Sequence, residues 1–485
     1  MTENISKRNF IIGLSLVFVL FFKYLPAPAG LSRRAMQVTG IFIGVLILWM
    51  NIGIHWPSML CIAALGFVPG LSMSGMLSAG FGNATFAFLM FTFMCTYTIS
   101  QTPFIRRCAL AFLTSKAAGK GPWAFVCRYF ASVVFLGCFM SPTVLVVVLI
   151  AVTEEIFAIL GLEKGDRLAA MMMMGMVFCS GIAAGMTPIA HVFPLMAMGY
   201  YTTATGNTIG YGQYMAAGIP AGILRTAAMV IIFRLFLKPD MSVLEKADVS
   251  ALKSSLPPIE KKEKYSLTIF FAVIALWVLP EFIKPFFPSV YNYINALGTA
   301  MPPLLGAVAM GIVTADGKPL LDFNRATSKG IPWASLIMVG ATLALGSAMT
   351  NADIGLTAFI SEKIAPVAAG LGAVGLVVLF AAWAAVQTNL SSNMVTVTVV
   401  CAIALPISLS GGVTNTAAIA CIIGMMASYA FATPPAMATI VFAIGSGWAD
   451  TKQFARYGFA LMAAGIAIAC TVGYPIAAAV MSSLA

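Results

Sequence analysis

Short polar side chains interrupt a very apolar chain at four points where the backbone is expected to leave the helical conformation. Two of these points read Ser141-Pro142-Thr143 and Ser392-Asn393-Met394, and the other two are Thr187-Pro188 and Thr433-Pro434. Proline removes a backbone donor and breaks a helix, so peptide N–H and C=O groups nearby are left unpaired. Helix N-termini bind anions, and unwound carbonyl groups bind Na⁺. These four points therefore predict ion binding that needs no charged side chain.

The elements that carry these residues are expected to be membrane-spanning helices. The chain has 485 residues, of which 60% are hydrophobic and 9% are charged, and its mean hydropathy is +0.97. A soluble domain has about 25% charged residues, so this chain must be solvated by lipid. Its apolar runs are about 16–25 residues long and do not alternate, which favours helices over a barrel. The predicted fold class is an all-α polytopic membrane protein.

Two segments are predicted to be re-entrant hairpins, and two are predicted to be broken transmembrane helices. The hairpins, at about 122–160 and 366–410, have the polar tips at their centres. The longer segments, at about 168–200 and 415–447, are interrupted by the Thr-Pro sequences. An unwound membrane helix is tolerated only where it is buried in protein or lines a wet cavity. Each half of the chain thus runs from a hairpin to a broken helix, which indicates an internal repeat.

The distribution of charge indicates that the two repeats are inverted. If the N-terminus is cytoplasmic, most of the 27 Lys and Arg residues face the cytoplasm, as expected from the positive-inside rule. The two hairpins then enter from opposite sides, an arrangement typical of secondary transporters. The predicted organisation is N-terminal scaffold helices (1–80), a first inverted repeat (81–237), a cytoplasmic charged linker (238–264) and a second inverted repeat (265–485). The predicted location is the cell membrane (plasma or inner membrane).

This layout resembles the divalent anion/sodium symporter family, whose members carry dicarboxylates, citrate or sulfate. That family has a Ser-Asn-Thr motif at each hairpin tip and Thr-Pro-rich breaks in two helices. The stretch Lys329-Gly330-Ile331-Pro332-Trp333 before an apolar helix is also similar. The chain departs from the family at Pro142 and Ala436 (Asn in the family), at Met394 (Thr) and at His191-Val192-Phe193-Pro194 (Thr-Pro-Pro-Asn). At least two substrate-facing amide groups are therefore absent.

The resemblance implies a homodimer in which a mobile part slides against a scaffold, like an elevator, and carries an anion with Na⁺. Substrate binding is expected at the tips and breaks, namely at Ser141, Pro142, Thr143, Thr187, Pro188, Ser392, Asn393, Met394, Thr433 and Pro434. Sodium is expected near Ser141, Thr143, Gly185, Ser392, Asn393 and Ala432. No other cofactor is expected.

Two further residues are candidates for substrate binding or ion coupling. Arg225 lies midway along the predicted span 214–237, where a buried arginine costs about 2.5–3.5 kcal/mol and usually marks a functional site. It could grip a carboxylate with two N–H groups, or extend to the interface or pair with a carbonyl. His191 follows the first break and could bind substrate or a coupling proton. The alternative for His191 is a packed, hydrogen-bonded histidine.

The leading interpretation is a secondary active transporter of a small anion, with a di- or tricarboxylate favoured and Na⁺ as the coupling ion. The alternatives are an anion exchanger or a carrier of sulfate or another anion with the same fold, and a cation/proton antiporter or channel built from inverted repeats. The acidic residues lie almost wholly in predicted loops, and there is no P-loop or His-Glu-x-x-His motif. No enzymatic activity is therefore predicted. The net charge of +11 is attributed to membrane topology rather than to nucleic-acid binding.

Overall fold

The computed structural model describes residues 2–114, 121–189, 191–245, 256–283, 286–433 and 437–484. These residues are almost entirely helical, and the described strands form one short antiparallel pair. Among them, eight helices are long and apolar enough to cross a membrane, or nine if the bent pair Met73–Gly80 and Ala84–Ser100 is one span. The prediction of an all-α polytopic membrane protein is confirmed.

The N-terminal helices attach to the second half of the chain. They are α1 Thr2–Phe21, a 3-10 turn Phe22–Tyr24, α2 Arg33–Asn51, α3 His55–Gly66, α4 Met73–Gly80, α5 Ala84–Ser100 and α6 Phe104–Leu113. Helices α2, α3 and α4 pack on α18 (Trp333–Thr350). The buried apolar side chains of α2 and α3 form one core with those of α18 and of α20 (Asn393–Gly411).

The segments predicted to form the first hairpin and the first broken helix each consist of two helices. The hairpin consists of α7 Pro122–Gly137 and α8 Pro142–Leu160, and the broken helix consists of α9 Arg167–Met186 and α10 Val192–Thr205. This half ends with α11 Tyr211–Ile232, a π-helical turn Phe233–Leu237 and the short α12 Ser242–Glu245.

The middle of the chain contains helices and the strand pair. They are α14 Lys261–Ile283, α15 Pro288–Ala296, α16 Met301–Ile312, β1 Thr314–Ala315, β2 Lys318–Pro319, α17 Phe323–Arg325 and a π-helical turn Ala326–Gly330. The predicted cytoplasmic charged linker 238–264 includes the start of α14, and Glu263 there is buried. Its carboxylate accepts from Arg107 of α6, with Nε–Oε1 at 2.9 Å. A buried carboxylate needs such a partner, so this end of the linker packs against the helices.

The second hairpin and broken helix follow α18. They are α19 Leu356–Leu390, α20 Asn393–Gly411, α21 Thr416–Ala427 and α22 Ala438–Gly445, followed by α23 Thr451–Ile468, a π-helical turn Ala469–Gly473, α24 Tyr474–Val480 and a 3-10 turn Ser482–Leu484. Helix α19 is interrupted at Gly372, where φ is 64°, a value that glycine adopts readily. The straight arm of the second hairpin therefore begins at this kink rather than at 366.

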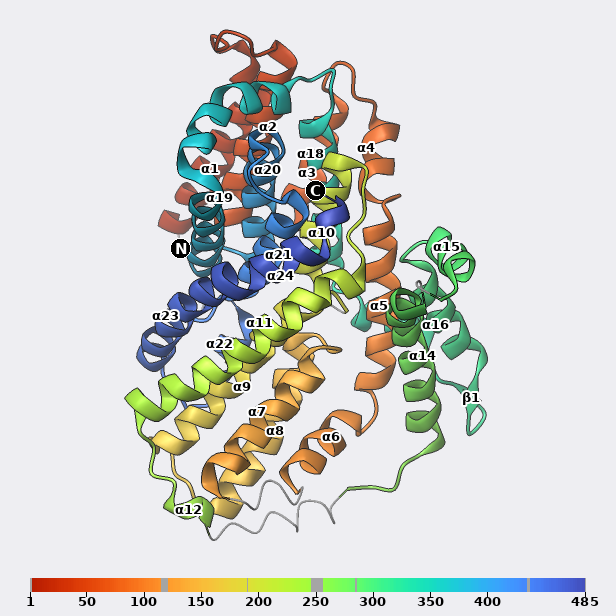
Figure 1. Cartoon of the computed structure of the whole chain (residues 1–485), viewed down its shortest axis with the longest axis vertical. Helices are drawn as coiled ribbons and strands as arrows, with labels where there is room; N and C mark the ends of the chain where they lie inside the picture. The colour runs from red at the N-terminus through yellow and green to blue at the C-terminus, as the bar shows by residue number, and fades with distance from the viewer. Residues whose placement is uncertain are drawn as a thin grey trace.

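The first parts of the two broken helices form the centre of the molecule. All residues from Leu168 to Met186 and from Thr416 to Ala427 are buried, as expected for helices that are apolar on all sides. Figure 1 shows α7 and α8 in the lower part of the molecule and α19 and α20 in the upper part. The hairpins thus approach the centre from opposite ends, which is compatible with the predicted inversion of the repeats.

Candidate ion- and anion-binding site

The first hairpin is fixed to the first helix break by two side chains. Helix α7 ends at Gly137, and its last carbonyl groups have no partner within the helix. Thr187 Oγ1 donates to the carbonyl of Cys138 over 2.6 Å, and His191 Nε2 donates to the carbonyl of Gly137 over 2.7 Å. Both side chains are buried. His191 therefore sits as a packed, hydrogen-bonded residue that holds the hairpin beside the break.

The second hairpin is fixed to the second break in a corresponding way. Near the end of α19, Asn389 Nδ2 donates to the carbonyl of Tyr429, and its Oδ1 accepts from the N–H of Ala432, both over 2.8 Å. Thr388 Oγ1 donates to the carbonyl of Ala427 over 2.6 Å. These bonds pair main-chain groups that the break leaves without helical partners. The sequence shows Thr388 and Asn389 at the hairpin centre, but no motif reveals which main-chain groups they bind.

Other predicted residues of the second half have differing surroundings. The hydroxyl of Thr433 donates to the carbonyl of Asn389. Pro434, predicted to bind substrate, lies outside the described residues. Met394 is partly buried and packs against both apolar cores. In the first half, Pro188 lies between α9 and α10.

The region of the first break packs closely against that of the second because two glycines of α9, Gly181 and Gly185, lie at the contact. A Cβ atom on Gly185 would lie 2.6 Å from Ser428 Oγ, and one on Gly181 would lie 2.6 Å from the ring of Phe431. Real Cβ atoms do not approach this closely, so only glycine permits this packing. The carbonyl of Gly185 also accepts a hydrogen bond from Tyr214 over 3.0 Å. The two breaks and the hairpin ends bound to them thus form one contiguous cluster.

Both hairpins return as helices whose N-terminal turns lack a side-chain cap. Ser141 precedes α8 and Ser392 precedes α20, and neither hydroxyl accepts from a main-chain N–H of its helix. Serine at this position usually accepts such a bond, so the first-turn N–H groups remain available to another acceptor. These groups and the helix dipole attract anions. Pro142 at the start of α8 removes an N–H that has no helical partner anyway.

A cavity of about 280 Å³ opens at the first tip. Ser141 and Thr143 line it on the hairpin side, α5 lines it opposite, and Lys329, Gly330 and Pro332 complete it. Within the described part of the chain, Lys329 is the only charged side chain in this lining. The sequence predicts Ser141 and Thr143 as site residues but misses Lys329, which enters only as part of the similar stretch 329–333.

The polar groups of the second tip are more enclosed than those of the first. Asn393 is 5% exposed, and its Oδ1 has no hydrogen-bond partner among the described residues. Ser392 is half-buried. An unpaired buried oxygen in a native protein usually binds a water or an ion, or has a functional role. The side chain of Asn393 is therefore suited to accept an ion or a hydrogen-bond donor of a ligand.

Arg225 is buried beside the second break and has no carboxylate partner among the residues that the structure describes. Its guanidinium lies 4.4 Å from the ring centroid of Tyr429 and donates to the hydroxyl of that tyrosine. Nη2 lies 3.3 Å from the carbonyl of Gly465 and 3.4 Å from the sulfur of Met426, and Nε has no partner within the same described ranges. A positive charge whose partners are all uncharged makes the local electrostatic potential more positive, and this favours a nearby anion. Arg225 therefore belongs to the second break rather than to the membrane surface.

Replacing Gly458 of α23 by alanine is expected to disturb the second break. The new Cβ would lie 2.5 Å from the carbonyl oxygen of Phe431 and 2.8 Å from the Cα of Ala432, and this main chain cannot easily move aside. Overpacking of this kind costs about 1–3 kcal/mol. We expect a lower temperature of thermal unfolding and reduced ligand-dependent stabilisation. Gly13→Ala in α1, where no described atom lies within 4 Å of the new Cβ, is the control, and an equal loss in both variants would contradict the expectation.

Comparison with known sequences gives one family for nearly the whole chain. The family model described as "Sodium:sulfate symporter transmembrane region" matches residues 6–482. A protein of Staphylococcus saprophyticus named "Sodium-dependent dicarboxylate transporter SdcS" is 23% identical over 93% of this chain and 88% of its own length. An uncharacterized transporter of Haemophilus influenzae is 22% identical over 97% of both chains.

Comparison with solved structures supports the fold. The crystal structure of the YdaH transporter of Alcanivorax borkumensis, described as having an unusual topology, matches with a TM-score of 0.58 at 15% identity. The match covers 93% of this chain and 98% of the other. At this identity the likeness concerns the fold alone.

Proposed function

Because the chain belongs to the sodium:sulfate symporter family, we propose that it carries a small anion, with a di- or tricarboxylate favoured, across the cell membrane together with Na⁺. The family match supports Na⁺-coupled anion transport in general, and a transporter rather than an enzyme. The name of the staphylococcal relatives, which are sodium-dependent dicarboxylate transporters, supports a carboxylate over sulfate.

The observation that carries this proposal is the pair of uncapped helix N-termini at Ser141 and Ser392. Each of them follows a hairpin tip that is hydrogen-bonded to a helix break, and the two breaks are in contact. Two such termini can bind the two ends of a dianion without a charged side chain. We assign substrate binding to the tips 141–143 and 392–394, with the breaks at 187–188 and 433–434 completing the site.

The proposed Na⁺ sites lie beside the same tips. At the first, Ser141 and Thr143 line the cavity, and their hydroxyl oxygens are the proposed ligands. At the second, the unpaired Oδ1 of Asn393 supplies an oxygen ligand. The carbonyl of Gly185 already accepts from Tyr214, and its second lone pair can still face a cation. Ala432 would contribute through its carbonyl, because its N–H is held by Asn389.

We further propose elevator-like movement of the hairpins and broken helices against a scaffold that includes residues 1–80. The moving elements come from the inverted repeats 81–237 and 265–485, the chain pairs as a homodimer, and its N-terminus is cytoplasmic. Two adjacent arginines of α6 connect the first hairpin to α14. Arg106 binds Glu155 of the hairpin helix α8 through two bonds of 2.8 and 2.7 Å, whereas the adjacent Arg107 binds Glu263 of α14. Movement of the hairpin relative to α14 would have to strain or break one of these ion pairs.

Uptake by proteoliposomes tests the proposed function. We expect an inward Na⁺ gradient to drive saturable uptake of labelled succinate or citrate, and excess unlabelled substrate inside to accelerate exchange, as a carrier requires. A K⁺ gradient is the control. Counterflow without Na⁺-driven net uptake would instead indicate the anion exchanger. Flux of carboxylate and sulfate that neither saturates nor shows counterflow would contradict a carrier.

Replacing Lys329 by glutamine is expected to raise the KM for a divalent anion on the order of tenfold, because a charge-assisted contact near the first tip is lost. The maximal rate should change less, since Lys329 lies outside both tips. Lys329→Arg keeps the charge and is expected to retain most of the affinity. An unchanged KM in Lys329→Gln would show that the cavity of about 280 Å³ is not on the path of the anion.

A further inference from the structure

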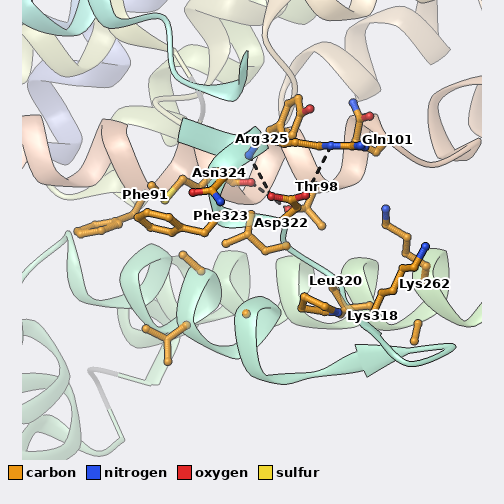
Figure 2. A pocket seen from close by; sticks show the side chains of 18 of the residues that line it. Phe91, Thr98, Gln101, Lys262, Lys318, Leu320, Asp322, Phe323, Asn324 and Arg325 are labelled. Atoms are coloured by element: carbon orange, nitrogen blue, oxygen red, sulfur yellow. Dashed lines mark hydrogen bonds and ion pairs between the residues drawn. The ribbon is translucent and has the colours of Figure 1, made fainter. Parts of the chain in front are cut away.

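A larger cavity, of about 950 Å³, lies away from the hairpin tips, between α5, α14 and α16. The strand pair and residues 320–325 also border this cavity (Figure 2). Its apolar walls are formed by Phe91 and Met94 of α5 and by Leu304 and Val308 of α16. Volumes of about 300–1,000 Å³ are typical of sites that enclose a ligand. The cavity is thus large enough for a lipid headgroup and the first part of its chains.

The cavity lies where three apolar helices begin or end. Helix α5 ends at Ser100, α14 begins at Lys261 and α16 ends at Ile312, and all three contribute to the cavity or adjoin it. On α16, Val308 is 49% exposed and Ile312 is 73% exposed. Apolar side chains exposed on a membrane helix face lipid. The cavity therefore combines a polar rim with an apolar wall, and that wall includes the exposed side chain of Val308.

The rim of the cavity presents charged side chains of both signs. Glu260 and Lys262 lie at the start of α14, Asp316 lies in the turn between β1 and β2, and Lys318 lies in β2, so each of these two segments brings one carboxylate and one ammonium group to the rim. Among the described residues, neither lysine forms an ion pair. Figure 2 shows Lys262 and Lys318 at the same end of the cavity. Two ammonium groups and two carboxylates complement a ligand that itself carries both a phosphate and an ammonium.

The other two charged residues of the rim, Asp322 and Arg325, form an ion pair with each other. Asp322 accepts from the main-chain N–H of Arg325 over 3.0 Å and pairs with its Nε at 3.5 Å. Figure 2 shows this pair apart from the two lysines. The rim charges that remain for a ligand are therefore those of Glu260, Lys262, Asp316 and Lys318.

We propose that this cavity binds one phosphatidylethanolamine molecule. Its phosphate is held by Lys262 and Lys318, its primary ammonium is held by Glu260 and Asp316, and its acyl chains follow the apolar face of α16. An ammonium with three N–H donors can bond to both carboxylates, whereas the choline of phosphatidylcholine has no N–H group and phosphatidylglycerol has no positive charge. The site therefore discriminates among these three headgroups.

The location also links the lipid to the proposed anion path. Tyr97 of α5 lines both this cavity and the smaller cavity that contains Lys329. A Cβ on Gly330 would lie 2.7 Å from Cγ of Tyr97, so the ring packs directly on the main chain next to Lys329. A bound headgroup would thus contact a side chain that borders the substrate cavity.

Native mass spectrometry of the full-length protein, purified in detergent and mixed with lipids of identical acyl chains, tests the proposal. We expect phosphatidylethanolamine to be retained over phosphatidylcholine and phosphatidylglycerol by on the order of tenfold. Lys262→Gln/Lys318→Gln should remove this retention. Lys261→Gln/Lys264→Gln, which removes the same charge from exposed positions of the same helix, should keep it. Glu260→Gln/Asp316→Asn should lose the preference over phosphatidylcholine.

Two further measurements distinguish a lipid held in this cavity from a headgroup attracted to surface charge. Gly311→Leu places a side chain into the cavity at a position where no described atom lies within 4 Å of the new Cβ, so it should fold and yet exclude the lipid. Glycerophosphoethanolamine, the headgroup without chains, should not bind detectably. Equal losses in the two lysine double variants, stronger retention of phosphatidylglycerol, or equal binding of the free headgroup would each overturn the proposal. None of these measurements depends on transport activity.

Discussion

Replacing Asn389 by leucine is expected to abolish Na⁺-driven uptake and to lower the free energy of unfolding by about 2–4 kcal/mol, since each buried polar group left unpaired costs about 1–3 kcal/mol. The amide of Asn389 holds the carbonyl of Tyr429 and the N–H of Ala432, two main-chain groups within the second break. Without it, the second tip and the second break are no longer fixed relative to each other. Uptake per folded molecule in proteoliposomes, together with thermal unfolding in detergent, measures both effects.

Asn415→Leu provides a matched control for this loss. Asn415 also makes one donor and one acceptor bond to the main chain, to the carbonyl of Met481 and the N–H of Ala418. It lies at the opposite end of α21, away from the break. We expect a similar loss of stability but uptake per folded molecule close to that of the unchanged protein. Equal loss of uptake in both variants would mean that Asn389 acts only through stability.

Replacing Arg225 by methionine is expected to reduce uptake at least about tenfold. The guanidinium is 1% exposed, and its contacts are a tyrosine ring and hydroxyl, a methionine sulfur and one carbonyl. Because no carboxylate of the described residues neutralises it, we expect its charge to stabilise an anion at the neighbouring break and its stacking to hold Tyr429 in place. Saturation kinetics of carboxylate uptake, recorded together with thermal unfolding, measure the consequence.

A double variant separates the charge of Arg225 from its structural contact. Methionine alone leaves the buried hydroxyl of Tyr429 without the donor that Arg225 provides, which costs about 1–3 kcal/mol. Arg225→Met/Tyr429→Phe removes both partners, and such paired replacement is often nearly neutral for stability. We therefore expect recovered stability without recovered uptake. If uptake returns together with stability, Arg225 has a structural role only.

The architecture was largely predictable from the sequence. Hydropathy and run length predict membrane helices, and the structure has pairs of helices in the segments predicted as hairpins, α7–α8 and α19–α20, and in those predicted as broken helices, α9–α10 and α21–α22. The predicted resemblance to the divalent anion/sodium symporter family is confirmed by the family match. These features were predictable because each of them depends on about 20 consecutive residues of the sequence.

The partners of the functional side chains were less predictable. Ser141 and Lys329 line one cavity although they belong to different halves of the chain. His191 was a candidate for substrate or proton binding, and the structure gives it the carbonyl of Gly137 as partner. Glu263 belongs to the segment predicted to be a cytoplasmic charged linker, but it is buried against Arg107. In each case the residue type was informative, whereas the partner depended on how distant helices pack.

The amino-acid sequence alone was enough to predict a helical membrane transporter with two interrupted spans and two polar hairpin tips. These features were predictable because lipid solvation and helix breaking act locally along the chain. Which donors meet which acceptors emerged only from the folded arrangement of the helices. Folding brought Asn389 to the second break, Thr187 to the end of α7 and Arg225 to Tyr429. A hydrogen bond is fixed within a few tenths of an ångström, and such distances are set by the packing of helices remote in sequence.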